Sequence, residues 1–114
     1  MPRVFVIEQP RIRFSQEKVE AFGTVVILFS DDDRRPSLFS PDEFADAVVE
    51  QLLKESFRPD EDCICVTGSM IAVSLLLMTV VSRWGRARLL MFNARSDGYV
   101  LKTFSGLVPT GDRT

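Results

Sequence analysis

Short continuous runs of apolar residues alternate with helix-like patterns along the chain. The runs at residues 4–7, 24–29 and 63–67 are rich in Val, Ile and Phe and end at Glu, Ser or Gly, which predicts buried strands. Residues 24–29 are apolar on both faces, so this strand is expected to be covered from both sides. Residues 86–92 and 99–104 predict two further strands, joined as an antiparallel hairpin by a turn at Asp97-Gly98. The pattern predicts a single α/β domain over residues 1–104, with a mixed, mostly parallel sheet of about five strands, two main helices and a C-terminal β-hairpin, followed by a tail over 105–114.

The first main helix is predicted over residues 41–57, before Pro59. Ser40 and Glu43 have the spacing of a capping box, and Phe39 and Phe44 have the spacing of a hydrophobic staple across it. Apolar residues recur at helical spacing while most acids lie off that stripe, which predicts one buried side. The stripe consists of Phe44, Val48 and Leu52, flanked by Ala45, Val49 and Leu53.

The second main helix is predicted over residues 69–84, between Gly68 and Gly85, and it is apolar nearly all round. One broad apolar face can pack on the sheet, and a second face carries Ile71, Leu75 and Met78. A domain of this size can cover one face with its sheet but hardly both. Either the other helix or a second subunit must therefore cover the second face, which makes these three residues a candidate interface and a homodimer the expected assembly.

Charge divides the chain into two segments of opposite sign, although the net charge of the 114 residues is only −2. Residues 42–62 carry eight acids against two bases, and residues 83–102 carry five bases against one acid. Such segments are typical of two solvated faces, and the functional alternative is a basic surface that meets an acidic partner. The small net charge argues against a general nucleic-acid binder or a membrane-surface protein, and the apolar run at 70–81 is too short to span a bilayer.

The residue types exclude much of the usual chemistry of sites. There is no histidine, and the two cysteines, Cys63 and Cys65, lie on one face of a strand, where they are expected to be small buried residues. No nucleophile and base can be paired by spacing, so the catalytic residues stay unknown. No cofactor is expected.

Three weaker sites can be named, each with a structural alternative. Thr67, Gly68 and Ser69 join a strand to a helix amino terminus, where an anion or nucleotide phosphate could bind, or where Ser69 simply caps the helix. Clustered carboxylates after the 24–29 strand could hold Mg²⁺ or form a solvated loop: Asp31, Asp32 and Asp33. A small basic patch could contact nucleic acid or simply be solvated: Arg83, Arg86, Arg88 and Arg95.

Four ordered fragments carry a resemblance to known proteins: residues 5–10, 21–28, 62–68 and 89–93 with 99–100, which together cover most of the chain up to Phe104. They resemble a family of small proteins of unknown function from tailed bacteriophages of marine and freshwater samples. The chain departs from those proteins at Ser69-Met70, where they carry Asp-Pro, and at Phe92-Asn93, where they carry Trp-Asp. The resemblance implies a phage protein in the host bacterial cytoplasm and supplies no mechanism.

Together these patterns favour a non-enzymatic phage accessory protein that acts through protein contacts, with a second copy or another protein as partner. The alternatives are a small-molecule or nucleotide-phosphate binding protein or enzyme that uses Thr67-Gly68-Ser69, and a nucleic-acid binder that uses the arginine patch. Nucleic acid is the less favoured partner, and no membrane association is expected.

Overall fold

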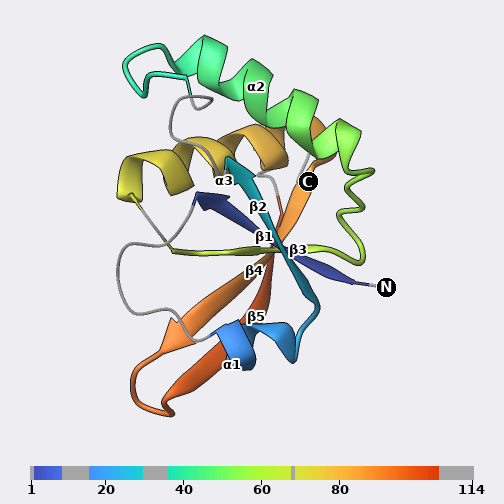
Figure 1. Cartoon of the computed structure of the whole chain (residues 1–114), viewed down its shortest axis with the longest axis vertical. Coiled ribbons are helices and arrows are strands. Elements are labelled where there is room, and N and C mark those ends of the chain that lie inside the picture. The colour runs from blue at the N-terminus through green and yellow to red at the C-terminus, as the bar shows by residue number, and fades with distance from the viewer. Residues whose placement is uncertain (1, 9–15, 30–35, 68, 106–114) are drawn as a thin grey trace, which may run out of the picture.

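A computed structural model describes residues 2–8, 16–29, 36–67 and 69–105, and in this part of the chain five strands form one sheet flanked by three helices (Figure 1). In chain order the elements are β1 (Arg3–Glu8), α1 (Gln16–Glu20), β2 (Thr24–Phe29), α2 (Pro41–Lys54), β3 (Cys63–Cys65), α3 (Met70–Trp84), β4 (Arg86–Asn93) and β5 (Gly98–Ser105). The predicted mixed, mostly parallel sheet with two main helices and a closing hairpin is confirmed.

The sheet has the order β2-β1-β3-β4-β5, so the first strand of the chain lies inside the sheet. β1 pairs in parallel with β2 and β3, β3 pairs in parallel with β4, and β4 pairs antiparallel with β5 from Arg86↔Ser105 to Asn93↔Gly98. The chain steps from β1 to β2 in one direction and then from β2 through β3 to β4 in the other. Crossovers between parallel strands are right-handed. The helix between β1 and β2 must therefore lie on one face of the sheet, and the helices that lead to β3 and β4 must lie on the other.

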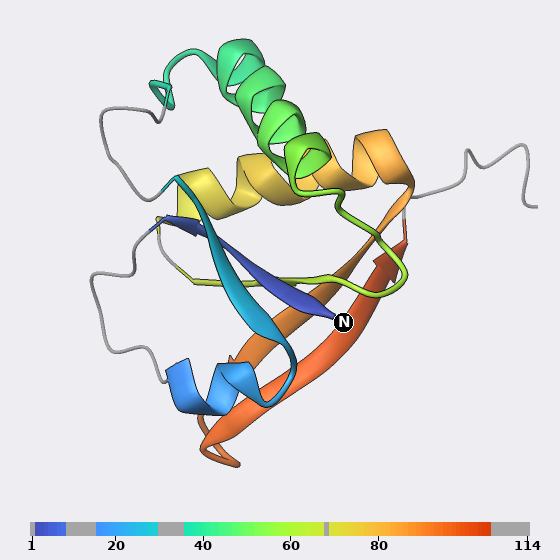
Figure 2. The same ribbon diagram turned by 45° about the vertical axis from the view of Figure 1, so that its right-hand side comes forward.

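The helices obey that rule. α2 and α3 pack together on one face, over a core that includes Phe5, Ile64 and Leu76, while α1 lies on the other face, where Val19 joins a second core that includes Val6 and Leu90. Figures 1 and 2 show the two long helices on one side and α1 on the other, beside the far end of β5. The molecule therefore has a thick helical layer on one face and a thin one on the other.

α2 begins at Pro41, as predicted, but its cap interactions and its end differ from the prediction. The Ser40 side chain makes no capping hydrogen bond, and Phe39 is 97% exposed, so the predicted capping box and hydrophobic staple are wrong. The helix ends at Lys54, and Phe57 instead turns back so that its ring lies 5.0 Å from the ring of Trp84 and 5.5 Å from that of Phe5. The aromatic side chain that was expected to extend the helix thus joins the core.

α3 agrees closely with its prediction. Ser69 precedes the helix and its Oγ accepts a hydrogen bond from the amide of Ala72 at 3.5 Å. Gly85 follows the helix with φ of 85°, a left-handed conformation that favours glycine. The strand before the helix is shorter than predicted, because β3 ends at Cys65. β2 contributes to both cores, as expected, but it is an edge strand and Val25, Val26 and Ile27 are only partly buried.

Candidate functional site

The outward side of α3 carries large apolar side chains that the described residues do not cover. Ile71 is 59% exposed and Met78 is 68% exposed, whereas Leu75 is partly buried and packs against the main core. The inward side of the helix packs on the sheet through Val73, Leu76 and Val80. Of the three residues predicted as an interface, the structure therefore leaves two on the surface and assigns the third partly to the domain itself.

An apolar groove lies along the flank of α3, between the helix and the β4–β5 hairpin. Its volume is about 810 Å³. Met78 of α3, which is 68% exposed, and Phe104 of β5, which is 50% exposed, both line it. The described residues that line it are Ser74, Leu77, Met78, Val81, Ser82, Ala87, Leu89 and Phe104. None of them is charged, so the groove can bury apolar groups without desolvating an ion.

A second, smaller hollow of about 440 Å³ follows the groove along the same hairpin. Met91 and Val100, which are opposite one another in the β4–β5 ladder, lie in it together with Lys102 and Arg95. Lys102 is the ladder partner of Leu89, which lines the groove, so the two hollows are adjacent. Figures 1 and 2 show that the far half of the hairpin extends past α2 and α3.

The sequence predicted neither hollow, although a signal for them was present. In β4 the side chains of Ala87, Leu89 and Met91 share one face, and Val100 and Phe104 lie on the same face of β5. An apolar strand face needs a covering layer, and among the described helices it is α3 that packs on this face of β4, while Leu89, Met91 and Val100 stay only partly buried. Comparing the number of apolar strand faces with the number of helices able to cover them would have identified this region.

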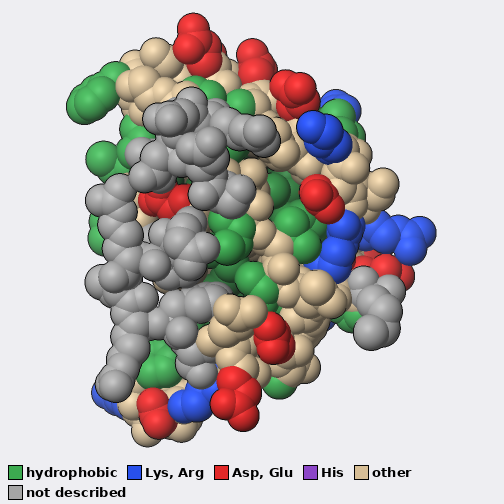
Figure 3. All heavy atoms as spheres, in the orientation of Figure 1, with side chains coloured by type: hydrophobic (Ala, Val, Ile, Leu, Met, Phe, Trp, Pro, Cys, Tyr) green, Lys and Arg blue, Asp and Glu red, His purple; other side chains and the backbone are tan. Residues whose placement is uncertain are grey.

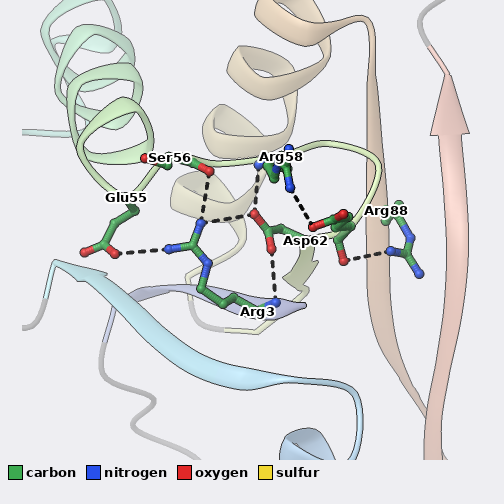
Figure 4. A network of polar contacts seen from close by, with 7 residues as sticks. Arg3, Glu55, Ser56, Arg58, Asp62 and Arg88 are labelled. Carbon is green, nitrogen blue, oxygen red and sulfur yellow. Dashed lines mark hydrogen bonds and ion pairs between the residues drawn. The ribbon is translucent and has the colours of Figure 1, made fainter. Parts of the chain in front are cut away.

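A buried carboxylate, that of Asp62, lies at the amino ends of β1 and β3. Asp62 is 1% exposed and accepts hydrogen bonds from the backbone amides of Arg3 at 3.0 Å and Arg58 at 2.8 Å, and from the guanidinium of Arg3 at 3.3 Å (Figure 4). The Arg3 guanidinium also donates to Glu55 and to the carbonyl oxygen of Ser56. This network ties the segment between α2 and β3 to the start of β1, so its role is structural.

The predicted anion site lies where the sequence placed it, after β3 and before α3. Thr67 and Ser69 flank this junction, while Gly68 lies outside the described residues. The Thr67 amide donates to the Cys65 carbonyl at 3.0 Å, and the Ser69 hydroxyl is the helix cap. The structure thus shows the capping role of Ser69, and anion binding at this turn stays a prediction.

The predicted metal ligands cannot be placed, because Asp31, Asp32 and Asp33 lie outside the described residues. Among the residues that the structure does describe, no three Cys, Asp or Glu side chains come together as a metal site.

The four arginines of the predicted nucleic-acid patch are not gathered at one place. Arg86 forms an ion pair with Asp60, and Arg88 donates to the carbonyl oxygens of Asp60 and Glu61 at 3.0 and 2.8 Å. Arg95 lies in the turn at the other end of β4, roughly 20 Å away at about 3.3 Å per residue. Arg83 ends α3, with its guanidinium 5.9 Å from the Trp84 ring centre. Two of the four positive charges therefore bind the acidic segment of the same chain.

The two cysteines are buried and free, as expected. Burial raises the pKa of the Cys63 thiol to about 11, with Arg88 opposing this and Asp62 adding to it. Burial also raises the pKa of the Cys65 thiol to about 12, and the neighbouring Cys63 adds to the effect. Both thiols stay protonated at neutral pH, which removes them as nucleophiles.

The surface of α2 is the acidic counterpart of the hairpin. Its exposed side carries Asp42, Glu43, Asp46 and Glu50, and Figure 3 shows acidic side chains along the edge of the molecule that α2 forms. Within the described residues, each helix is too short or too polar to cross a lipid bilayer.

The fold and these surfaces define a small α/β domain with an open apolar groove beside its last helix. The Phage Pam3 gp32-like protein family has a sequence model that matches residues 2–105 of this chain. Because the match spans nearly the whole chain, the protein belongs to that bacteriophage family, which confirms the resemblance to phage proteins. Comparison with curated proteins and with solved structures gives no significant match.

Proposed function

We propose that this phage protein works through protein–protein contacts rather than catalysis, in the cytoplasm of the bacterial host, and that it forms a homodimer through the outward side of α3. The observation that carries the proposal is the exposure of Ile71 and Met78, at 59% and 68%, on a helix whose only charged residue is Arg83. Monomeric proteins seldom leave contiguous large apolar side chains on one helix face in water.

The large apolar side chains of α3 supply about half of the area of an ordinary interface. Met70, at the start of the same helix, is 83% exposed. At roughly 200 Å² for a fully exposed large side chain, Met70, Ile71 and Met78 together offer about 400 Å². That is about half of the ~800 Å² that each partner contributes to a standard interface, before the surrounding smaller residues are counted. α3 carries no acid, and its one base, Arg83, lies in the last turn. Two copies can therefore pack Ile71 and Met78 together without burying a charged side chain.

Sedimentation velocity across the micromolar range tests the dimer. The wild-type protein is expected to sediment as a dimer, and Ile71→Asp as a monomer with an unchanged circular dichroism spectrum, because a buried carboxylate at the interface is costly. Ile71 is a better test position than Leu75, whose substitution would also disturb the core. Asp46→Lys, at an exposed position of α2, is the control and should remain dimeric. A wild-type monomer, or a dimer that Ile71→Asp leaves intact, would overturn the proposal.

A further inference from the structure

The face of the β4–β5 hairpin that looks toward the helical layer is covered only in part. α3 packs against β1 and β4, and α2 packs against β2, while the short α1 contacts β5 from the other side of the sheet. Leu89, Met91 and Val100 are only partly buried. The layer that holds α2 and α3 therefore has room for one more element beside α3. We name this surface the hairpin track, and define it by Ala87, Leu89, Met91, Arg95, Val100, Lys102 and Phe104.

The dimensions of the hairpin track match a helix. From Ala87 to Asn93 the strand advances six residues, which is roughly 20 Å at about 3.3 Å per residue. A helix of about 13 residues has the same length and presents three or four apolar side chains along one stripe. The 810 Å³ groove lies between a helix and a sheet, so a helix placed there would pack against both.

The positive charge of the hairpin track favours a helix that carries acidic residues on both sides of its apolar stripe. Lys102 and Arg95 line the smaller hollow, and no described residue that lines either hollow carries a carboxylate. The one acid of the hairpin, Asp97, receives a hydrogen bond from the Lys18 ammonium of α1 at 2.9 Å through its carbonyl oxygen and is drawn toward that helix. An apolar floor with two cations at its side is complementary to a helix with an apolar stripe and acidic flanks.

From this geometry we propose that the hairpin track binds an acidic amphipathic helix of a different protein, which lies beside α3 as a third helix on that face of the sheet. A second copy of this chain offers no described helix of the required kind. The acid-flanked stripe of α2 is buried in its own core through Phe44, Val48 and Leu52, and α3 has no acid. α1 has five residues and is too short. The two proposed surfaces adjoin at Met78, which lines the groove and is also exposed on the outward side of α3. Ile71 belongs to the dimer surface alone, and Lys102 and Arg95 belong to the hairpin track alone, so variants at these positions let the two proposals fail independently.

Fluorescence anisotropy with synthetic helical peptides of about 18 residues tests the proposal on the full chain. The probe has leucines at positions i, i+4, i+7 and i+11 with glutamates on both flanks, and its matched control has lysines in place of the glutamates. The glutamate peptide is expected to bind at least about tenfold more tightly, and added salt should reduce the difference. Lys102→Glu combined with Arg95→Glu should reverse the preference without unfolding the protein, because both side chains are exposed. Ile71→Asp should bind the glutamate peptide as the wild type does.

Amide NMR shifts locate the bound peptide. Changes confined to residues 87–93 and 98–104, with helical circular dichroism of the peptide, would support the proposal. Equal affinity for the two peptides, no binding at all, changes centred on Ile71 and Met70, or a peptide bound as an extra strand at the outer edge of β5 would each overturn it. Loss of dimerisation in the Lys102→Glu and Arg95→Glu variant would assign the hairpin track to the dimer and would also overturn it.

Discussion

Removal of the Asp62 carboxylate should destabilise the domain more than any change at its charged surface. Asp62→Ala leaves the backbone amides of Arg3 and Arg58 without their acceptor in a site that is 1% exposed. Each unsatisfied buried donor costs about 1–3 kcal/mol, and the Arg3 guanidinium keeps Glu55 and Ser56 as partners, so we expect a total loss of about 3–5 kcal/mol. Small domains are stable by only ~5–15 kcal/mol, and this loss is therefore a large part of the whole. Asp62→Asn keeps one acceptor oxygen and should cost about 1–3 kcal/mol.

Urea unfolding followed by the fluorescence of Trp84 measures this loss, because the Trp84 ring packs 5.0 Å from Phe57 in the segment that Asp62 holds. Glu61→Ala is the matched control. Its carboxylate is 47% exposed and pairs with Arg58 at the surface, where an ion pair contributes about 0–1 kcal/mol. If Asp62→Ala costs no more than Glu61→Ala, the hydrogen bonds to Asp62 do not hold the segment and the reasoning fails.

Two further predictions concern a glycine and the buried thiols. Gly23→Ala should lower the free energy of unfolding by about 1–3 kcal/mol in the same urea assay, because a Cβ there would lie 2.6 Å from the backbone oxygen of Pro2; wild-type stability would contradict this. For Cys63 and Cys65, the folded pKa values of about 11 and about 12 lie above the ordinary 9.0, so folding favours the protonated thiols. Their contribution to stability should be complete below pH 9 and decline as the pH rises through 11 to 12. The double variant Cys63→Ala, Cys65→Ala should lose less stability than the wild type over that interval, and parallel pH profiles of the two proteins would refute the assignment.

The sequence was sufficient for the elements of the fold because most of them are determined locally. α3 lies between a serine that caps it and a glycine with positive φ, and both signals act within one helical turn. The hairpin has Asp97-Gly98 at its turn, and Asp97 adopts φ of 51°. The order of the strands in the sheet could not be predicted from the sequence. The position of β1 between β2 and β3 depends on pairings such as Val4↔Cys63, between residues about sixty positions apart.

The start of α2 shows how a local signature can fail. Phe44 is drawn into the core, where its ring lies 6.0 Å from that of Phe29, and this fixes how the helix sits. The turn before the helix is held by Ser37. Its hydroxyl accepts a hydrogen bond from the Phe39 amide, and its carbonyl oxygen accepts one from the Ser40 amide. Phe39 is then directed into solvent. The local turn at Ser37 therefore stands where a side-chain cap by Ser40 was predicted.

The candidate sites depended on distant contacts and were predicted less well. The apolar outward side of α3 could be predicted from the sequence, because apolar residues run nearly all round the helix and the sheet can cover only one side of it. The arginine patch could not be judged, because Asp60 and Glu61 approach Arg86 and Arg88 only in the folded sheet. The hairpin track was missed because its residues come from two separate strands and form one surface only after those strands pair.

The inner position of β1 also has a consequence for synthesis on the ribosome. When residues 3–54 have emerged, β1 can already pair with β2 and α2 can form, but the other edge of β1 stays open until Cys63–Cys65 arrive. An open strand edge is a template for wrong pairing with neighbouring nascent chains. Asp62, the residue just before β3, reaches Arg3 at the very beginning of β1 and so closes that edge in the correct register as soon as translation delivers it.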